Sequence, residues 1–224
     1  MRVGVLTGLA SEAKLLARCM SLGDRLLVHR TGADPARARA EAERLAAAGP
    51  RALISFGLAG GIDPARRPGD LVIADRVVLP GGRAIETDAG WRRSLLAAAP
   101  TALVGAVAGT DRMLVSAADK RRLHAETGAA AADMESHVLA LAAEKAGLPL
   151  LVVRAVGDPA WRDVASVALV PLRADGTVRL GAVSRALCAK PLEWPGVFAL
   201  ARETRAGLMS LRRVAASLTL PGAA

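Results

Sequence analysis

Hydrophobic residues gather along the chain in short runs that alternate with longer segments of mixed polarity. A buried strand needs only about four to eight apolar residues, whereas a helix repeats its apolar positions every three or four residues over a longer stretch. Strands are therefore expected at residues 2–7, 25–30, 52–56, 71–78, 102–108 and 148–156. The last run is apolar on both faces, so helices must cover both faces of a mainly parallel sheet. The pattern predicts an α/β fold.

Helical segments lie between and after these strands. They are expected at residues 11–20, 34–48, 133–146 and beyond about 192. The second has clear signals at both ends. Asp34 can accept hydrogen bonds from the free N–H groups at the helix start, Pro35 is tolerated at the first helical position, and Gly49-Pro50 stops the helix.

Length and composition restrict the class of protein. The 224 residues suit one α/β domain spanning residues 1–224. Aromatic residues make up only 2% of the chain, so the core must be built from smaller aliphatic side chains. No apolar run reaches the roughly 18 residues that a membrane-spanning helix needs, and the N-terminus has the pattern of a strand rather than a signal peptide. Cys19 and Cys188 have no metal-ligand spacing, so we interpret them as reduced thiols of a cytoplasmic protein and expect no metal site.

The formal net charge is +9, from 30 basic and 21 acidic residues. Such an excess can indicate a nucleic acid or an anionic membrane as partner. The basic residues are scattered, however, and three Trp and two Phe cannot supply a stacking platform for bases. We interpret the charge as a solvated basic surface and expect no nucleic-acid partner.

The C-terminal helix leaves two interpretations open. Its apolar residues recur at helical spacing with arginines among them: Phe198, Ala201, Leu208, Leu211, Ala215 and Leu218, with Arg202, Arg205, Arg212 and Arg213. The favoured interpretation is that the apolar stripe packs on the sheet or on a partner subunit. The alternative is peripheral contact with an anionic membrane, which a basic amphipathic helix can bind.

Polar clusters follow four of the expected strands, and ligands of open α/β sheets bind at such strand ends. The first contains Gly8, with Ser11 as the expected helix cap and Glu12 in the first helical turn, where the helix dipole favours an anion. The second is a glycine-rich loop at 57–61, which includes Gly60 and allows close approach of backbone to a ligand. Taken singly, each is also typical of an ordinary helix start or turn.

The other two clusters carry carboxylates suited to ligand binding and acid catalysis. Asp133 is the expected cap of a helix whose first turn holds Glu135, and a carboxylate there can accept two hydrogen bonds from a vicinal diol. Asp158 follows the most buried strand, and burial raises a carboxyl pKa toward neutrality, as a proton donor requires. The structural alternatives are a carboxylate that complements the helix dipole and a turn aspartate before Pro159.

Five pieces of sequence occur in order over the first 158 residues: Val3-Gly4-Val5 with Gly8 and Glu12, Gly57-Leu58-Ala59-Gly60-Gly61, Gly69-Asp70-Leu71-Val72, Asp133-Met134-Glu135, and Pro149 through Asp158. The ordered set resembles the purine nucleoside phosphorylase and nucleosidase superfamily, most closely its methylthioadenosine/adenosylhomocysteine nucleosidase branch. The resemblance implies a three-layer fold with a mixed, mainly parallel twisted sheet flanked by helices, and assembly into homo-oligomers, dimers or larger.

The resemblance also implies an activity, cleavage of the N-glycosidic bond of a purine (adenine) nucleoside. Asp158 would protonate the base at N7, and Glu12 would orient or deprotonate the attacking water. Substrate contacts would come from Met134 and Glu135 at the ribose, from Met113 and Leu114 at the base, and from Gly8 and Gly60. No cofactor is implied, and phosphate stays open as a co-substrate.

Two departures from the family pattern bear on substrate and nucleophile. Phosphorylases of the superfamily commonly carry an Arg and a Ser where this chain has Ser55 to Leu58. The difference favours water over phosphate as the nucleophile, although Arg30, Arg37 or Arg112 could still bind a phosphate. The second departure is an extra segment at 170–177. Together with the missing aromatic base-stacker and the basic, alanine-rich composition, it resembles the hopanoid-associated phosphorylases, whose implied substrate is adenosylhopane, an adenosine joined to a lipid.

Two other interpretations of the function compete with cleavage of an adenosyl-lipid. One is a nucleosidase for methylthioadenosine or a related small nucleoside. The other is a non-catalytic nucleoside-binding module, against which the three carboxylates of Glu12, Glu135 and Asp158 argue, since a binder of an uncharged nucleoside has little use for them.

Overall fold

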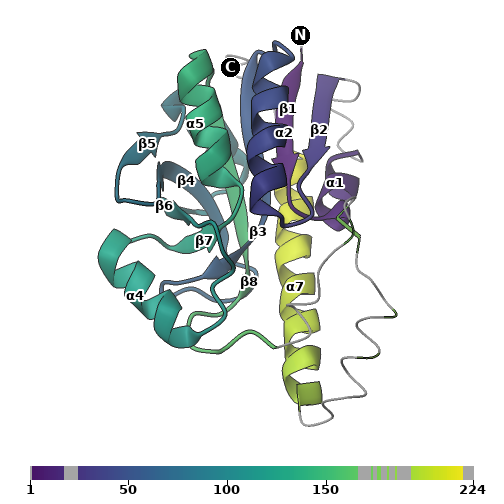
Figure 1. Ribbon diagram of the computed structural model, residues 1–224, viewed down its shortest axis with the longest axis vertical. Helices are drawn as coiled ribbons and strands as arrows, with labels where there is room; N and C mark the ends of the chain where they lie inside the picture. Colours follow the sequence, from purple (N-terminus) through teal and green to yellow (C-terminus); the bar gives the residue numbers. More distant parts are fainter. Residues whose placement is uncertain are drawn as a thin grey trace.

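The computed structural model describes residues 2–17, 25–165, 173, 176–177, 181, 185 and 193–218, and shows an α/β fold with a central sheet and helices on both of its faces (Figure 1). The strands are β1 (Val3–Thr7), β2 (Leu26–Arg30), β3 (Ala52–Gly61), β4 (Leu71–Val78), β5 (Ala84–Glu86), β6 (Leu103–Gly109), β7 (Ala131–Asp133) and β8 (Leu150–Asp158). The helices are α1 (Ala10–Ala17), α2 (Pro35–Ala47), α3 (Ala89–Ala98), α4 (Ala117–Thr127), α5 (Ser136–Ala146) and α7 (Trp194–Ala215).

The sheet mixes parallel and antiparallel pairs, as expected. Its described strands follow the order β2-β1-β3-β7-β6-β4-β5, and β8 pairs with both β3 and β4. Strands β3, β7, β6, β4 and β8 therefore form a closed ring, which the sequence did not predict. The pairs of β3 with β8 and of β6 with β7 are parallel, whereas β8 runs antiparallel to β4, and β3 to β7.

Two hydrophobic clusters hold helices against opposite faces of the sheet. In one, Leu45 of α2 and Leu139 of α5 pack on strand residues such as Leu53. In the other, Trp91 of α3 and Leu211 of α7 pack on different strand residues. The strands buried on both faces are thus covered by helices from both sides, as the run at 148–156 indicated.

Strand pairing brings the polar clusters to one edge of the sheet. Strands β1, β3 and β8 are mutually parallel, so their carboxyl ends meet there. In the register, Gly60 of β3 faces Asp158 of β8 on one side and Ala132 of β7 on the other. The clusters at Gly8, Gly60, Asp133 and Asp158 therefore come together although 150 positions separate the first from the last.

Several expected boundaries were wrong. The glycines at 57–61 are the second half of strand β3 and not a loop, because the backbone there pairs with β8 and β7. Ser11 is no cap, since α1 begins at Ala10. Asp133 ends strand β7, and Glu135 stands at the helix boundary rather than in the first turn of α5, which begins at Ser136. Elements β5, β7, α3 and α4 were not expected.

Other boundaries are confirmed. Helix α2 begins at Pro35, with Asp34 accepting a hydrogen bond from the N–H of Arg37 at 3.0 Å. Strand β4 covers 71–78 as expected. Helix α5 ends at Gly147, whose φ of 63° is a left-handed conformation that glycine adopts without steric cost.

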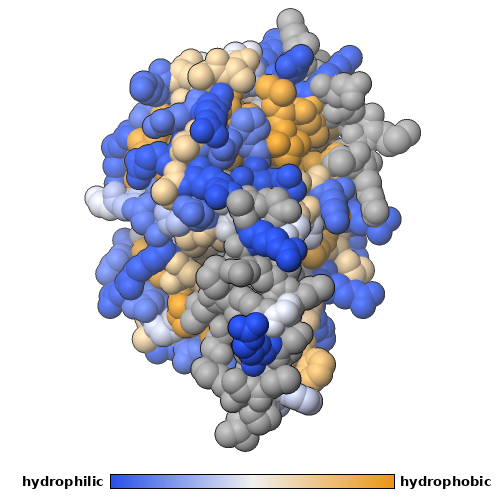
Figure 2. All heavy atoms as spheres, turned by 45° about the vertical axis from the view of Figure 1, so that its right-hand side comes forward, coloured by the Kyte–Doolittle hydropathy of each residue, from blue (hydrophilic) through white to orange (hydrophobic). Residues whose placement is uncertain are grey.

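Packing on the sheet is confirmed for four of the six apolar residues named in the C-terminal helix, since the partly buried Leu208 packs against the same core cluster as Leu211, Ala215 and Leu218. Leu211 and Ala215 of α7 and the following Leu218 are buried, whereas Phe198 is 70% exposed. The four arginines Arg202, Arg205, Arg212 and Arg213 are all exposed. None of the described helices is long and apolar enough to cross a membrane. On the face that Figure 2 shows, hydrophilic side chains are widely spread, with smaller apolar areas among them.

The extra segment at 170–177 and the two cysteines lie largely or wholly outside the described residues. Of that segment, the structure describes Arg173, Gly176 and Thr177. The carbonyl of Gly176 accepts a hydrogen bond from the N–H of Ala10 at 3.1 Å. This contact joins the segment to the start of α1.

Two glycines of strand β6 test the packing of α5 on the sheet. A Cβ added at Gly109 would lie 2.1 Å from Cβ of His137, whereas one added at Gly105 would meet no atom closer than 3.8 Å. Gly109→Ala should therefore lower the free energy of unfolding by about 1–3 kcal/mol through overpacking. Gly105→Ala, the matched control, should leave it within about 0.5 kcal/mol of the wild-type value. Urea unfolding of both variants measures the difference, and equal stabilities would contradict this packing.

Candidate active site

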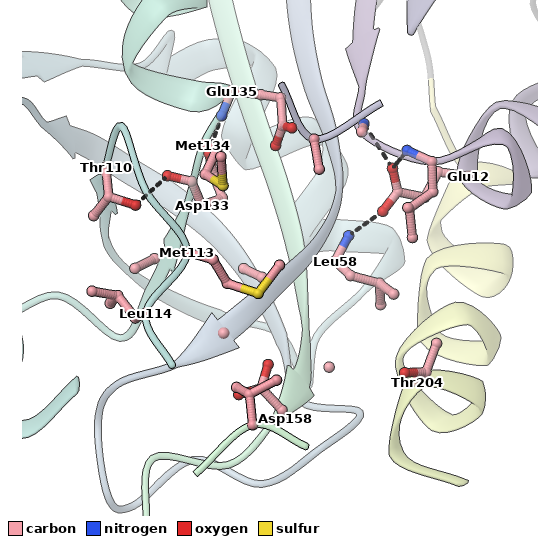
Figure 3. A pocket seen from close by; sticks show the side chains of 18 of the residues that line it. Glu12, Leu58, Thr110, Met113, Leu114, Asp133, Met134, Glu135, Asp158 and Thr204 are labelled. Atoms are coloured by element: carbon pink, nitrogen blue, oxygen red, sulfur yellow. Dashed lines mark hydrogen bonds between the residues drawn. The ribbon is translucent and has the colours of Figure 1, made fainter. Parts of the chain in front are cut away.

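All eight residues that the sequence nominated line one pocket at the carboxyl edge of the sheet: Gly8, Glu12, Gly60, Met113, Leu114, Met134, Glu135 and Asp158. The cavity has a volume of about 210 Å³. Figure 3 shows Asp158 at one end of the pocket and Glu12 and Glu135 at the other, with the Met113 side chain between them. A ligand in this pocket therefore meets carboxylates at both ends and thioether and aliphatic groups in the middle.

Glu12 is held by three backbone amides. Its Oε2 accepts hydrogen bonds from the N–H of Gly8 at 2.9 Å and of Leu9 at 2.8 Å, and its Oε1 accepts one from Leu58 at 2.8 Å (Figure 3). The residue is 2% exposed. Burial raises the pKa of Glu12 to about 7, although the amides and Arg154 act in the opposite direction. A carboxylate with such a pKa is suited to accept a proton near neutrality.

Glu135 is positioned by the start of helix α5. Asp133 Oδ1 accepts the N–H groups of Glu135 and Ser136 at 2.8 and 2.6 Å, which satisfies two free donors at the helix terminus. Asp133 thus performs the capping that the sequence predicted, from two positions before the N-cap residue Glu135. Glu135 Oε1 accepts a hydrogen bond from the hydroxyl of Thr31 at 3.0 Å. Burial raises the pKa of Glu135, and the charge of Arg154 opposes this.

Arg154 is a buried residue of the site to which the sequence pattern assigned no role. It lies on β8 with its side chain 1% exposed, 2.8 Å from Asp133 Oδ2 and 3.6 Å from Glu135 Oε2. It also donates to the hydroxyl of Ser55 at 2.6 Å. A signal was present, because an arginine inside an otherwise apolar strand must be paired with carboxylates or other acceptors when it is buried.

Asp158 ends strand β8 and is the carboxylate at the far end of the pocket. Its side chain is 20% exposed. Burial raises the pKa of Asp158, while Lys120, which donates a hydrogen bond to Oδ2, acts to lower it. Lys120 is a second residue that the sequence did not single out.

Gly57, in the part of β3 that was expected to be a loop, is required by the packing of the site. A Cβ at Gly57 would lie 2.7 Å from Arg154 Nη1 and 2.8 Å from the carboxyl carbon of Glu12. The bare backbone at this position therefore lets the carboxylate and the guanidinium approach the strand. Any larger residue at position 57 would collide with Glu12 or Arg154.

The described lining of the cavity carries acidic but no basic side chains. No lysine or arginine is among the described residues that line it. The three arginines considered for a phosphate clamp, Arg30, Arg37 and Arg112, all lie outside that lining. Arg154 compensates the buried carboxylates from behind them.

Comparisons with known proteins agree with this architecture. A sequence profile described as the phosphorylase superfamily matches residues 2–175. The 5′-methylthioadenosine/S-adenosylhomocysteine nucleosidase of Neisseria meningitidis, solved with methylthio-immucillin-A, has a TM-score of 0.70 at 18% identity, with 97% of each chain covered. The corresponding nucleosidase of S. pneumoniae has a TM-score of 0.68 at 16% identity, covering 98% of this chain and 100% of its own.

A futalosine hydrolase mutant of Helicobacter pylori is also similar, with a TM-score of 0.60 at 17% identity over 70% of this chain and 89% of its own. A search of curated proteins finds no match. At these identities the solved structures demonstrate the shared fold, α/β with a mixed sheet, as the sequence predicted.

Removing the buried guanidinium should destabilise the protein in a pH-dependent way. Arg154→Met leaves the neighbouring carboxylates uncompensated, and loss of one partner of a buried ion pair typically costs about 3–5 kcal/mol. Without Arg154, the pKa values of Glu12 and Glu135 should rise further above the ordinary 4.5. A carboxyl group whose pKa is raised in the folded state lowers the free energy of unfolding as the pH rises. The loss of stability in Arg154→Met should therefore be smallest near pH 4.5 and largest above pH 7.

Thermal unfolding across that pH range measures this effect. The control is Arg83→Met, which removes the exposed arginine paired with Glu144 at 2.7 Å and should leave the midpoint unchanged. An Arg154→Met deficit that did not vary with pH would contradict the electrostatic account.

Proposed function

The chain belongs to the phosphorylase superfamily, and from that premise we propose that it cleaves the N-glycosidic bond of a purine nucleoside. The observation that supports this most directly is the division of the pocket, with Asp158 at one end and Glu12 and Glu135 at the other. A nucleoside has the same division, since its base must gain a proton as it leaves while its sugar becomes cationic.

Asp158 is proposed to act on the base. The carboxyl group donates a proton to a ring nitrogen of the purine, the bond between the base and C1′ breaks, and its electron pair leaves with the base. The departing base is then neutral. The raised pKa of Asp158 supports this role, because a proton donor must keep its proton near the working pH.

The two glutamates are proposed to act on the sugar. Glu135 accepts hydrogen bonds from ribose hydroxyls, and its charge stabilises the oxocarbenium-like ring that forms as the base departs. Water then bonds to C1′ through its oxygen, and Glu12 takes the proton that this water releases. Met134 packs beside the sugar, Met113 and Leu114 contact the base, and Gly8 and Gly60 allow close approach of the backbone.

Water is the nucleophile that the geometry favours over phosphate. The backbone amides of Gly8, Leu9 and Leu58 could bind an anion, but the carboxylate of Glu12 already occupies them. A phosphate dianion at this end would meet the carboxylates of Glu12 and Glu135, and no lysine or arginine is among the described residues that line the pocket. Hydrolysis is therefore proposed, with ribose rather than ribose 1-phosphate as the sugar product.

The 5′ substituent is proposed to be a small thioether or a long apolar chain. Nucleosidases for methylthioadenosine are among the similar structures, which supports the first. A specific observation supports the second: Met113 lines the pocket while 40% exposed, and Leu200 lines it from α7, the helix that also carries the exposed Phe198 and Trp194. Because the cavity is below the roughly 300–1,000 Å³ of typical ligand pockets, a lipid chain would have to leave it beside these apolar groups.

Product analysis tests the activity. The protein is incubated with methylthioadenosine, or with an adenosine bearing a long alkyl chain at C5′ in anionic vesicles, each with and without phosphate. We expect adenine and the free sugar at equal rates in both buffers. Asp158→Asn should lower kcat by about 10²- to 10⁴-fold. Phosphate-dependent formation of a sugar 1-phosphate would contradict the proposal that water is the nucleophile. Binding of the nucleosides without any turnover would contradict catalysis and indicate a non-catalytic binding module.

The pH dependence of the rate tests the role of Glu12. A general base works when deprotonated, so the rate should rise with pH through an apparent pKa near 7, the value to which burial raises Glu12. Glu12→Gln should lower kcat and remove this limb of the profile. A Glu12→Gln variant that kept the limb would show that another group titrates.

A further inference from the structure

Lys120 is buried beside the pocket at the end where Asp158 lies. It belongs to helix α4 and is 0% exposed, whereas the next two residues of that helix, Arg121 and Arg122, are exposed. A buried ammonium is costly unless its donors are paired with acceptors. The surroundings of Lys120 should therefore explain why a lysine lies there.

All three donors of the Lys120 ammonium are used within one short segment. Nζ donates to Asp158 Oδ2, to the carbonyl of Pro159 at 2.9 Å and to the carbonyl of Arg162 at 3.0 Å. An ammonium has three donors, so the group is fully satisfied as a cation. Lys120 thus fixes both the carboxylate of Asp158 and the backbone that follows it.

The contacts distinguish the two oxygens of Asp158. Among the described residues, Lys120 is the one hydrogen-bond donor to this carboxylate, and it takes Oδ2. An oxygen that accepts from an ammonium is the poorer site for a proton. The proton that Asp158 carries therefore belongs on Oδ1, which no described side chain or amide engages.

We propose that Lys120 is a positioning residue for the acid: it directs the transferable proton of Asp158 to Oδ1 and stabilises the carboxylate that remains after the proton has moved to the base. This rests on the proposed function of Asp158. In the reaction the O–H bond at Oδ1 breaks and the base nitrogen gains the proton. The negative charge left on Asp158 is then balanced by the neighbouring ammonium, so the interaction is stronger after proton transfer than before it.

Other charged groups face Asp158 and modulate the same equilibrium. Glu203 of α7 acts to raise the pKa of Asp158, and Arg162 acts to lower it. These two side chains form an ion pair with each other, so their effects on Asp158 largely oppose one another. Asp163 is engaged elsewhere, because its Oδ1 accepts the N–H of Ala117 at 2.7 Å. Lys120 is therefore the cation whose removal should change the acid most.

The experiment measures kcat and KM against pH for the wild type, Lys120→Met and Asp158→Asn, using an adenine nucleoside that the wild type cleaves. An opposite charge in contact lowers a carboxyl pKa by about 1 to 3 units. Lys120→Met should therefore move the alkaline limb of kcat upward by about 1 to 3 pH units. Its maximal kcat should fall by about tenfold or more because Asp158 becomes a weaker acid, and KM should change little.

A second arm uses a riboside whose leaving group needs no proton, such as a p-nitrophenyl riboside. Both Lys120→Met and Asp158→Asn should retain most of their activity on it. The double variant should be no slower on the adenine nucleoside than Asp158→Asn alone, because the lysine acts through the aspartate. Arg121→Met, which removes an exposed cation from the same helix, is the control and should match the wild type.

The outcomes separate the two proposals. An unchanged alkaline limb in Lys120→Met, or an equal loss on both leaving groups, would overturn the role of Lys120 while leaving that of Asp158. Near wild-type kcat in Asp158→Asn would overturn the acid itself. If Lys120→Met does not fold, Lys120→Gln, which keeps two donors without the charge, carries the same expectations.

Discussion

The rest of the site depends on the ion pairs that the buried guanidinium of Arg154 forms with Asp133 and Glu135. Glu12, Asp133 and Glu135 are all buried, and carboxylates in such surroundings are stable only when a cation or several donors compensate them. Arg154 contacts two of them and the hydroxyl of Ser55, and its charge acts on the third. One residue of β8 therefore ties together segments from α1, β3 and the β7–α5 junction. The bare backbone of Gly57 makes room for it.

The closed ring of strands explains how these segments meet. Strand β8 pairs with β3 on one side and with β4 on the other, while β7 joins β3 to β6. An open sheet would place its chemistry along one line of strand ends. Here the ends of β1, β3 and β8 and the β7–α5 junction surround a cavity instead, and the carboxylates of Asp158 and Glu12 lie at opposite ends of it (Figure 3).

Two buried cations, Arg154 and Lys120, contact the carboxylates of the pocket from outside its lining. Arg154 compensates the end with the two glutamates, and Lys120 compensates the end with Asp158, yet neither is among the residues that line the cavity. A ligand therefore meets carboxyl groups and apolar side chains without a competing cation. Such a surface suits an uncharged nucleoside better than a phosphate ester, and it makes the protonation states of Glu12, Glu135 and Asp158 a main chemical variable of the site.

Features that depend on neighbouring residues could be predicted from the sequence. The Asp34-Pro35 start of α2, the strand at 71–78 and the buried strand before Asp158 were all predictable from spacing and local capping chemistry. Gly8, Glu12, Gly60, Glu135 and Asp158 were predictable because each lies at or near the end of a strand, where side chains of an α/β fold gather. Met113, Leu114 and Met134 were expected only from the resemblance to the family. The cations that compensate the buried carboxylates could not be predicted, because they come from distant parts of the chain. The glycines at 57–61 look like a loop until β8 and β7 supply their hydrogen-bond partners. Lys120 and Asp158 are 38 positions apart in sequence, and Arg154 meets its carboxylates only when the ring of strands closes. A buried charge is stable only when charged or polar groups that pack against it compensate it, and here those groups come from distant parts of the chain.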